Sequence, residues 1–125
     1  MCLDGRFEGV EMRTLESARL TADEKTSVIE AAQVLKSDLP VSRVIVFGSK
    51  ARGTGGRDSD LDLLVLTSRP VTPDLRAAVS EKLAEINLRY DGGLSSVVVY
   101  EKDWSEGLVR YLLIHSEVER DGCEV

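Results

Sequence analysis

Two aspartates, Asp60 and Asp62, stand on either side of Leu61 where the apolar run LDLLVL begins. If this run is a strand, alternate residues point to the same face, so both carboxylates lie on one side and Leu61 on the other. Two carboxylates held close together repel each other, and a divalent cation removes that repulsion. Magnesium suits the pair because it prefers oxygen ligands and takes one or two carboxylates together with substrate phosphates.

A candidate phosphate-binding loop precedes the acidic pair. Gly48 and Ser49 end the apolar run VIVF, and ten residues separate them from the first aspartate. Glycine lets the backbone approach a ligand closely, and the turn after it can direct N–H groups and a hydroxyl at a phosphate. Lys50, Arg52 and Arg57 add three cations to this loop, in a chain whose net charge is −6. Arginine suits phosphate because its guanidinium makes paired hydrogen bonds.

Two familiar loop types do not fit these residues. A calcium loop starting at Asp58 needs Gly at its sixth position and Glu at its twelfth, where the chain has Leu63 and Arg69. A Walker-type phosphate loop needs Lys directly after its last Gly, whereas Thr54 follows Gly53. For the D-x-D pair taken alone, a solvated turn or a helix cap stays open as an alternative.

The rest of the chain alternates between helical and strand patterns, which predicts one α/β domain. Thr21 and Glu24 have capping-box spacing, and Thr72 followed by Pro73 marks a second helix start. Short β-branched or apolar runs predict the strands. The predicted elements up to residue 100 are helix 22–37, strand 42–48, strand 61–67, a helix from Pro73 to the break YDGG at 90–93, and strand 94–100.

The two ends of the chain are less regular. Asp103 and Glu106 again have capping-box spacing and predict a helix over 104–115. Its inward stripe would be Trp104, Leu108, Tyr111 and Leu112. The last residues, ERDGCEV, fit a turn with an optional final strand, and residues 1–13 are a candidate loose N-terminal arm.

Composition limits the function classes. A chain of 125 residues suits one domain, and its net charge argues against extensive nucleic-acid binding. Cys2 and Cys123 have no zinc-site spacing. No apolar run approaches the roughly 20 residues that span a bilayer, and MCLDGRFEGV has no signal-peptide core, so no membrane association and a cytoplasmic location are expected. Homo-oligomerisation stays open.

The segments VIVFGSKARG and SDLDLLV together resemble the signature of the nucleotidyltransferase superfamily that includes DNA polymerase beta. The chain looks closest to the minimal nucleotidyltransferases. The resemblance implies a mixed sheet with helices packed on it, and transfer of a nucleoside monophosphate, AMP from ATP by preference, to an acceptor hydroxyl. It also implies roles for individual residues: Asp60 and Asp62 bind two magnesium ions, Gly48, Ser49, Lys50 and Arg52 contact the nucleotide, and Ser59 supports the loop or touches phosphate.

The chain departs from the family pattern on the third predicted strand. The family carries a third carboxylate there, and the equivalent position in LSSVVVY is Ser96, or Ser95 with a one-residue slip. Asp91 and Glu101 flank the strand as more distant substitutes, and the second magnesium site is left in question. Minimal members commonly work beside a helical HEPN protein as an antitoxin, so we expect such a partner in trans. The alternative is a catalytically impaired nucleotide- or partner-binding module.

Overall fold

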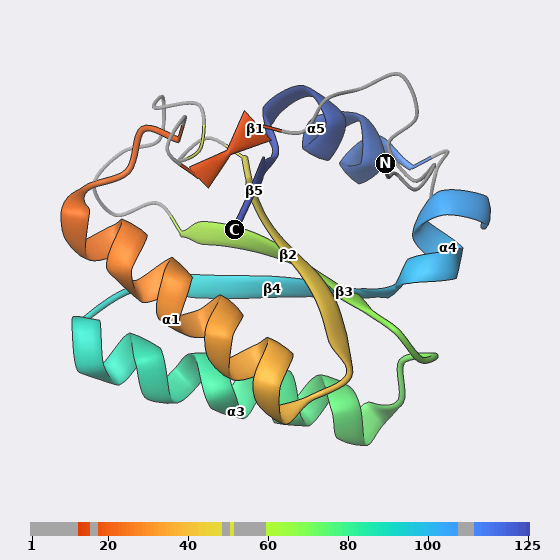
Figure 1. The fold of residues 1–125 in the computed structure, drawn as a ribbon, viewed down its shortest axis with the longest axis horizontal. Coiled ribbons are helices and arrows are strands. Elements are labelled where there is room, and N and C mark those ends of the chain that lie inside the picture. Colours follow the sequence, from red (N-terminus) through yellow and green to blue (C-terminus); the bar gives the residue numbers. More distant parts are fainter. Residues whose placement is uncertain (1–12, 16–17, 49–50, 52–59, 108–111) are drawn as a thin grey trace.

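A computed structural model describes residues 13–15, 18–48, 51, 60–107 and 112–125. Its centre is a five-stranded mixed sheet in the order β1-β5-β2-β3-β4 (Figure 1). The strands are β1 (Arg13–Thr14), β2 (Val41–Phe47), β3 (Leu61–Thr67), β4 (Leu94–Tyr100) and β5 (Cys123–Glu124). The helices are α1 (Ala22–Asp38), α3 (Pro73–Tyr90), α4 (Glu101–Glu106) and α5 (Leu113–Asp121). This architecture confirms the predicted mixed sheet with helices packed on it.

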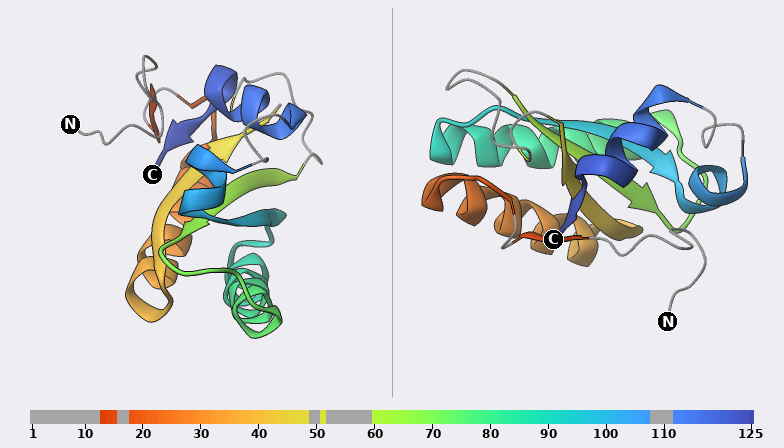
Figure 2. Two further views of the ribbon diagram at one scale, coloured as in Figure 1. Left: turned by 90° about the vertical axis from the view of Figure 1, so that its right-hand side faces the viewer. Right: turned by 90° about the horizontal axis from the view of Figure 1, so that it is seen from above.

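Helices cover both faces of the sheet (Figure 2). α1 and α3 pack together on one face, over the inward residues of β2, β3 and β4. α4 and α5 cover the other face, where Trp104 is fully buried and stacks on His115 with ring centroids 4.5 Å apart. β3 lies in the interior of this layered structure, and its residues 63–67 are buried on both faces. Its continuous apolar run is therefore explained by burial on two sides.

Capping residues determine where the two long helices, α1 and α3, begin. The Thr21 hydroxyl accepts a hydrogen bond from the Glu24 N–H (3.1 Å), and the Glu24 carboxylate accepts one from the Thr21 N–H (2.9 Å). The Thr72 hydroxyl accepts a hydrogen bond from the Leu75 N–H (3.1 Å), and Pro73 is the first residue of α3. Both helix starts are as predicted, β3 and β4 have their predicted bounds, and α1 and β2 differ from prediction by one residue.

The helix predicted over 104–115 is wrong. α4 begins at Glu101, directly after β4, and Gly107 ends it with extended backbone (ψ −173°), while α5 begins only at Leu113. Asp103 therefore lies inside α4, and its capping box with Glu106 is not the start of a helix. The side chains predicted to point inward also differ: Trp104 is buried, Leu112 is 55% exposed, and Leu108 and Tyr111 lie outside the described residues.

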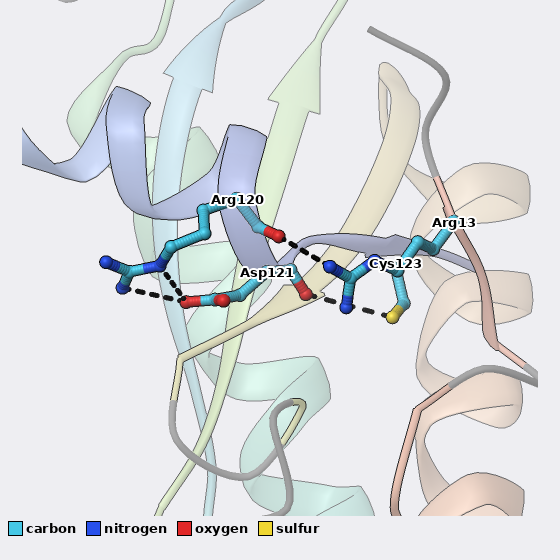
Figure 3. A network of polar contacts seen from close by, with 4 residues as sticks. All are labelled: Arg13, Arg120, Asp121 and Cys123. Carbon is cyan, nitrogen blue, oxygen red and sulfur yellow. Dashed lines mark hydrogen bonds and ion pairs between the residues drawn. The ribbon is translucent and has the colours of Figure 1, made fainter.

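The ends of the described chain meet in the sheet. β1 pairs in parallel with β5, so Arg13 is part of the sheet and not of a loose arm, while residues 1–12 lie outside the described residues. Figure 3 shows the contacts that accompany this pairing: Arg13 donates to the Arg120 carbonyl oxygen (2.9 Å), and the Arg120 guanidinium donates to the Asp121 carboxylate (2.9 and 3.0 Å). β5 confirms the optional final strand. Among the described helices, none has the length and apolar character needed to cross a membrane.

Candidate functional site

The acidic pair lies at the amino-terminal end of β3. Leu61 is 4% exposed and packs in the core beneath α1 and α3. Because side chains alternate along a strand, its neighbours Asp60 and Asp62 point to the opposite face. Asp60 is exposed and Asp62 is half-buried. The two carboxylates therefore lie on one face of the strand, at its open end.

Asp62 is held between the two neighbouring strands. Phe47 of β2 and Ser95 of β4 flank it in the sheet register. The Ser95 hydroxyl donates a hydrogen bond to Asp62 Oδ1 (3.1 Å). On the β2 side the backbone turns at Gly48 with φ +85°, and a Cβ built there would lie 2.7 Å from Asp62 Oδ2. Glycine is required because any other residue would be strained at this φ and its Cβ would collide with the carboxylate.

Asp60 is positioned by the turn that leads into β4. The Leu61 N–H donates to the Gly93 carbonyl oxygen (3.0 Å), and a Cβ built at Gly93 would approach Asp60 Oδ1 to 3.1 Å. Asn87 fixes this turn from α3: its side-chain amide donates to the Leu94 carbonyl oxygen (3.0 Å), and its Oδ1 accepts from the Leu94 N–H (2.8 Å). The turn thus sets the space available to the Asp60 carboxylate.

Ser95 is the residue of β4 that lies beside Asp62. It pairs with Asp62 and shares its face, whereas Ser96 pairs with Leu63 and lies on the opposite face of β4. Both serines line a groove together with Ser80 and other residues of α3, so it is the register that distinguishes them. Of the two predicted alternatives, Ser95 is therefore the one that shares a face with the acidic pair.

Neither predicted substitute completes the pair. Asp91 is the C-cap of α3 (φ +50°) and lines a small cavity with Asp23 and Glu24 of α1, beside Leu61 on the side that α1 and α3 cover. Glu101 begins α4 beyond the far end of β4. It is six residues past Ser95, about 20 Å along the strand at roughly 3.3 Å per residue.

The donor set fits one hard cation. Within the described ranges, no group of three or more His, Cys, Asp or Glu side chains is placed to hold a metal ion. Two carboxylates suit a magnesium ion that takes its remaining ligands from water and from substrate phosphates. The site is therefore one in which cation and phosphorylated ligand would bind together.

The structure brings together Gly48, Asp60 and Asp62 of the predicted site residues. The other predicted nucleotide contacts, Ser49, Lys50, Arg52 and Ser59, lie outside the described residues. Sequence reasoning missed Asn87 and Gly93. The GG pair in YDGG signals a turn, but nothing in the local sequence shows that this turn lies against Asp60.

Sequence comparison connects the chain to known proteins. The model of the nucleotidyltransferase domain family matches residues 28–121. The inferred protein adenylyltransferase MJ0141 of Methanocaldococcus jannaschii is 31% identical over an alignment 104 residues long, which covers 78% of this chain and 98% of MJ0141.

Solved structures share the fold at lower identity. A chain from the crystal structure of a toxin–antitoxin complex with AMP-PNP has a TM-score of 0.54 and 20% identity, covering 83% of this chain and 72% of that chain. A chain from the complex of tri-AMPylated Shewanella oneidensis HEPN toxin with MNT antitoxin has a TM-score of 0.51 and 17% identity, covering 81% and 70% respectively. At these identities the likeness concerns the fold.

Proposed function

Because the chain belongs to the nucleotidyltransferase domain family, we propose that it transfers a nucleoside monophosphate from a nucleoside triphosphate to a hydroxyl group. ATP is the proposed substrate, supported by the identity to an inferred protein adenylyltransferase. The observation that carries the proposal is the placement of Asp60 and Asp62 on one face, with the Gly48 backbone against the Asp62 carboxylate. Two carboxylates that suit a cation are thus present next to Gly48, the residue that precedes the loop predicted to hold phosphates.

The proposal assigns each predicted residue a task. Asp60 and Asp62 hold magnesium, and the nucleotide contacts are Gly48, Ser49, Lys50, Arg52 and Ser59. Bound magnesium supplies charge neutralisation at phosphate oxygens and orients the triphosphate for in-line displacement. The contribution of Gly48 is space, because its missing side chain leaves Asp62 Oδ2 uncovered.

We also propose that a helical HEPN-type protein is the partner, within a toxin–antitoxin pair. Complexes of this kind are among the solved structures with the same fold. In one of them the HEPN toxin is tri-AMPylated. That modification favours an acceptor hydroxyl on the partner protein here as well.

A second candidate function is nucleotide or partner binding without transfer. Ser95 favours it, because a neutral hydroxyl stands beside Asp62 where the family carries a third carboxylate. The transferase and a nucleotide-binding module require the same nucleotide site and differ only in whether the AMP group is moved, whereas a module that binds only its partner does not require that site.

Calorimetric titration with AMP-PNP, with and without magnesium, tests the shared site. The wild type is expected to bind in a magnesium-dependent way, and Asp60→Asn/Asp62→Asn to weaken binding at least about thirtyfold, roughly 2 kcal/mol. Glu81→Gln/Glu85→Gln is the matched control, because it removes two charges from the exposed surface of α3. No binding by the wild type would contradict the transferase and the nucleotide-binding module, and would favour a module that binds only its partner.

Incubation with α-labelled ATP and a HEPN-type partner then separates the candidates. Label on the partner, absent with the aspartate double variant, supports the transferase. Nucleotide binding without label supports the binding module.

Gly93→Ala is expected to weaken magnesium-dependent AMP-PNP binding by about threefold to tenfold, up to roughly 1.4 kcal/mol. Its Cβ at 3.1 Å would displace the Asp60 carboxylate. Gly92→Ala is the matched control, because its Cβ would lie 3.6 Å from Asn87 Oδ1, an ordinary contact. The same titration compares the two variants, and equal affinities would show that the turn does not constrain Asp60.

A further inference from the structure

We propose that this site holds one divalent cation per bound nucleotide, not two, and that Ser95 is the residue that limits it to one. The inference rests on the proposed nucleotide binding and specifies the metal content of that same site. Its basis is the set of side chains that surround Asp60 and Asp62 on their face of the sheet, the face opposite α1 and α3.

No third acid reaches the pair from β4. Three residues of β4 and of the turn before it lie on this face. Gly93 lies beside Asp60 and Ser95 beside Asp62. Val97 pairs with Leu64, the next residue of β3 on the same face. All three are uncharged. A carboxylate from this strand could contact a cation held by the pair only from these positions, because the intervening residues point to the α3 side.

β2, the strand on the other side of β3, supplies no third carboxylate either. Asp62 pairs there with Phe47, whose side chain belongs to the core beneath α4 and α5. After Phe47 comes Gly48, where the structure has no room even for a Cβ. Both neighbours of Asp62 in the sheet are therefore occupied by groups that bring no negative charge.

The Ser95 hydroxyl is already engaged in a hydrogen bond with Asp62. It donates to Asp62 Oδ1 (3.1 Å), which leaves Oδ2 on the Gly48 side. The bond orients the carboxylate, so that one oxygen is engaged by Ser95 and the other faces Gly48. A hydroxyl in this role positions Asp62 but adds no charge to offset a second cation.

The supply of protein carboxylates then decides the stoichiometry. The two aspartates hold one divalent cation, which completes its coordination with triphosphate oxygens. In two-metal sites the ions lie about 3.5–4 Å apart. A second ion that does not share the triphosphate oxygens therefore needs a further anionic ligand from the protein. The described part of the chain offers no such anionic ligand. We therefore expect the site to bind the cation that contacts the nucleotide and not a second one.

Counting Mn²⁺ bound per AMP-PNP tests the inference without relying on activity. Equilibrium dialysis at saturating AMP-PNP measures both quantities, as the excess of Mn²⁺ and the excess of nucleotide on the protein side of the membrane. We expect one Mn²⁺ per bound nucleotide for the wild type and two for Ser95→Asp. Ser96→Asp is the matched control: it adds the same charge one residue away on the opposite face, and it should stay at one.

A thermal melt gives a second readout. Without metal, Ser95→Asp is expected to melt below Ser96→Asp, because it places a carboxylate against Asp62 and removes the hydrogen bond. Mn²⁺ should raise the melting temperature of Ser95→Asp more than that of Ser96→Asp. If Ser95→Asp does not fold, the wild-type count decides, supported by Ser95→Ala, which should also bind one ion.

Two Mn²⁺ per nucleotide in the wild type would overturn the inference while leaving nucleotide binding intact. One Mn²⁺ in a folded Ser95→Asp variant would overturn the role assigned to Ser95. Absence of any AMP-PNP binding by the wild type would instead contradict the proposed function, so the two failures are distinguishable.

Discussion

Gly48→Ala is expected to abolish magnesium-dependent AMP-PNP binding, with affinity lowered at least about hundredfold, or roughly 2.7 kcal/mol. Its Cβ would stand 2.7 Å from Asp62 Oδ2, so the carboxylate or the backbone before the phosphate loop must move. Alanine at φ +85° also strains the backbone by about 1–2 kcal/mol. The expected result is thus a moderate loss of stability and a much larger loss of ligand affinity.

Gly48→Asn separates these two effects. Asparagine tolerates left-handed backbone better than alanine, so the strain should be smaller, while its Cβ meets the same carboxylate oxygen. Urea denaturation should therefore show Gly48→Asn to be more stable than Gly48→Ala, while calorimetry shows both to be deficient in binding. Normal AMP-PNP affinity in either variant would show that binding does not require the Gly48 backbone to lie this close to the Asp62 carboxylate.

Trp104→Ala is expected to lower the free energy of unfolding by about 3–5 kcal/mol, the range for removing a large buried aromatic side chain. Trp104 is fully buried and anchors α4 to the face of the sheet opposite α1 and α3. It also stacks on His115 of α5, so its loss leaves a cavity between both short helices and the sheet. A loss of this size is a large fraction of the stability of an ordinary domain.

Urea denaturation followed by circular dichroism measures this change. Fluorescence is unsuitable because Trp104 is the only tryptophan of the chain. Leu88→Ala is the control, because Leu88 is 87% exposed on α3 and its loss should alter stability by no more than about 0.5 kcal/mol. A loss below about 1 kcal/mol for Trp104→Ala would mean that α4 contributes little to the packing.

The sequence predicted those elements whose signals are local. Capping residues fixed where α1 and α3 begin, and the apolar runs of β3 and β4 gave both strands their bounds. The acidic pair was predicted for the same reason, because the D-x-D spacing alone places two carboxylates on one face of a strand. Periodicity and capping require no knowledge of distant neighbours.

The errors arose where tertiary contacts override local pattern. The capping-box spacing of Asp103 and Glu106 suggested a helix start, but α4 begins directly at the end of β4 and Gly107 stops it. The choice between Ser95 and Ser96 needed the register between β3 and β4, which no local signal gives. The same holds for Gly93 and Asn87, whose roles depend on a turn packing against a strand that lies far earlier in the chain.

The interior place of β5 has a consequence for the order in which the domain assembles. β5 comes last among the described strands yet lies between β1 and β2, and its Glu124 forms an ion pair with Arg43. Contacts between segments so distant in sequence form slowly, because a long loop must close first. We expect strands β2, β3 and β4 to pair earlier. β3, with Asp60 and Asp62 at its beginning, then already has both of its neighbouring strands in place. β1 can pair only after β5 is in place. We therefore expect the backbone amide hydrogens at this edge of the sheet to be the last that become protected from exchange with solvent.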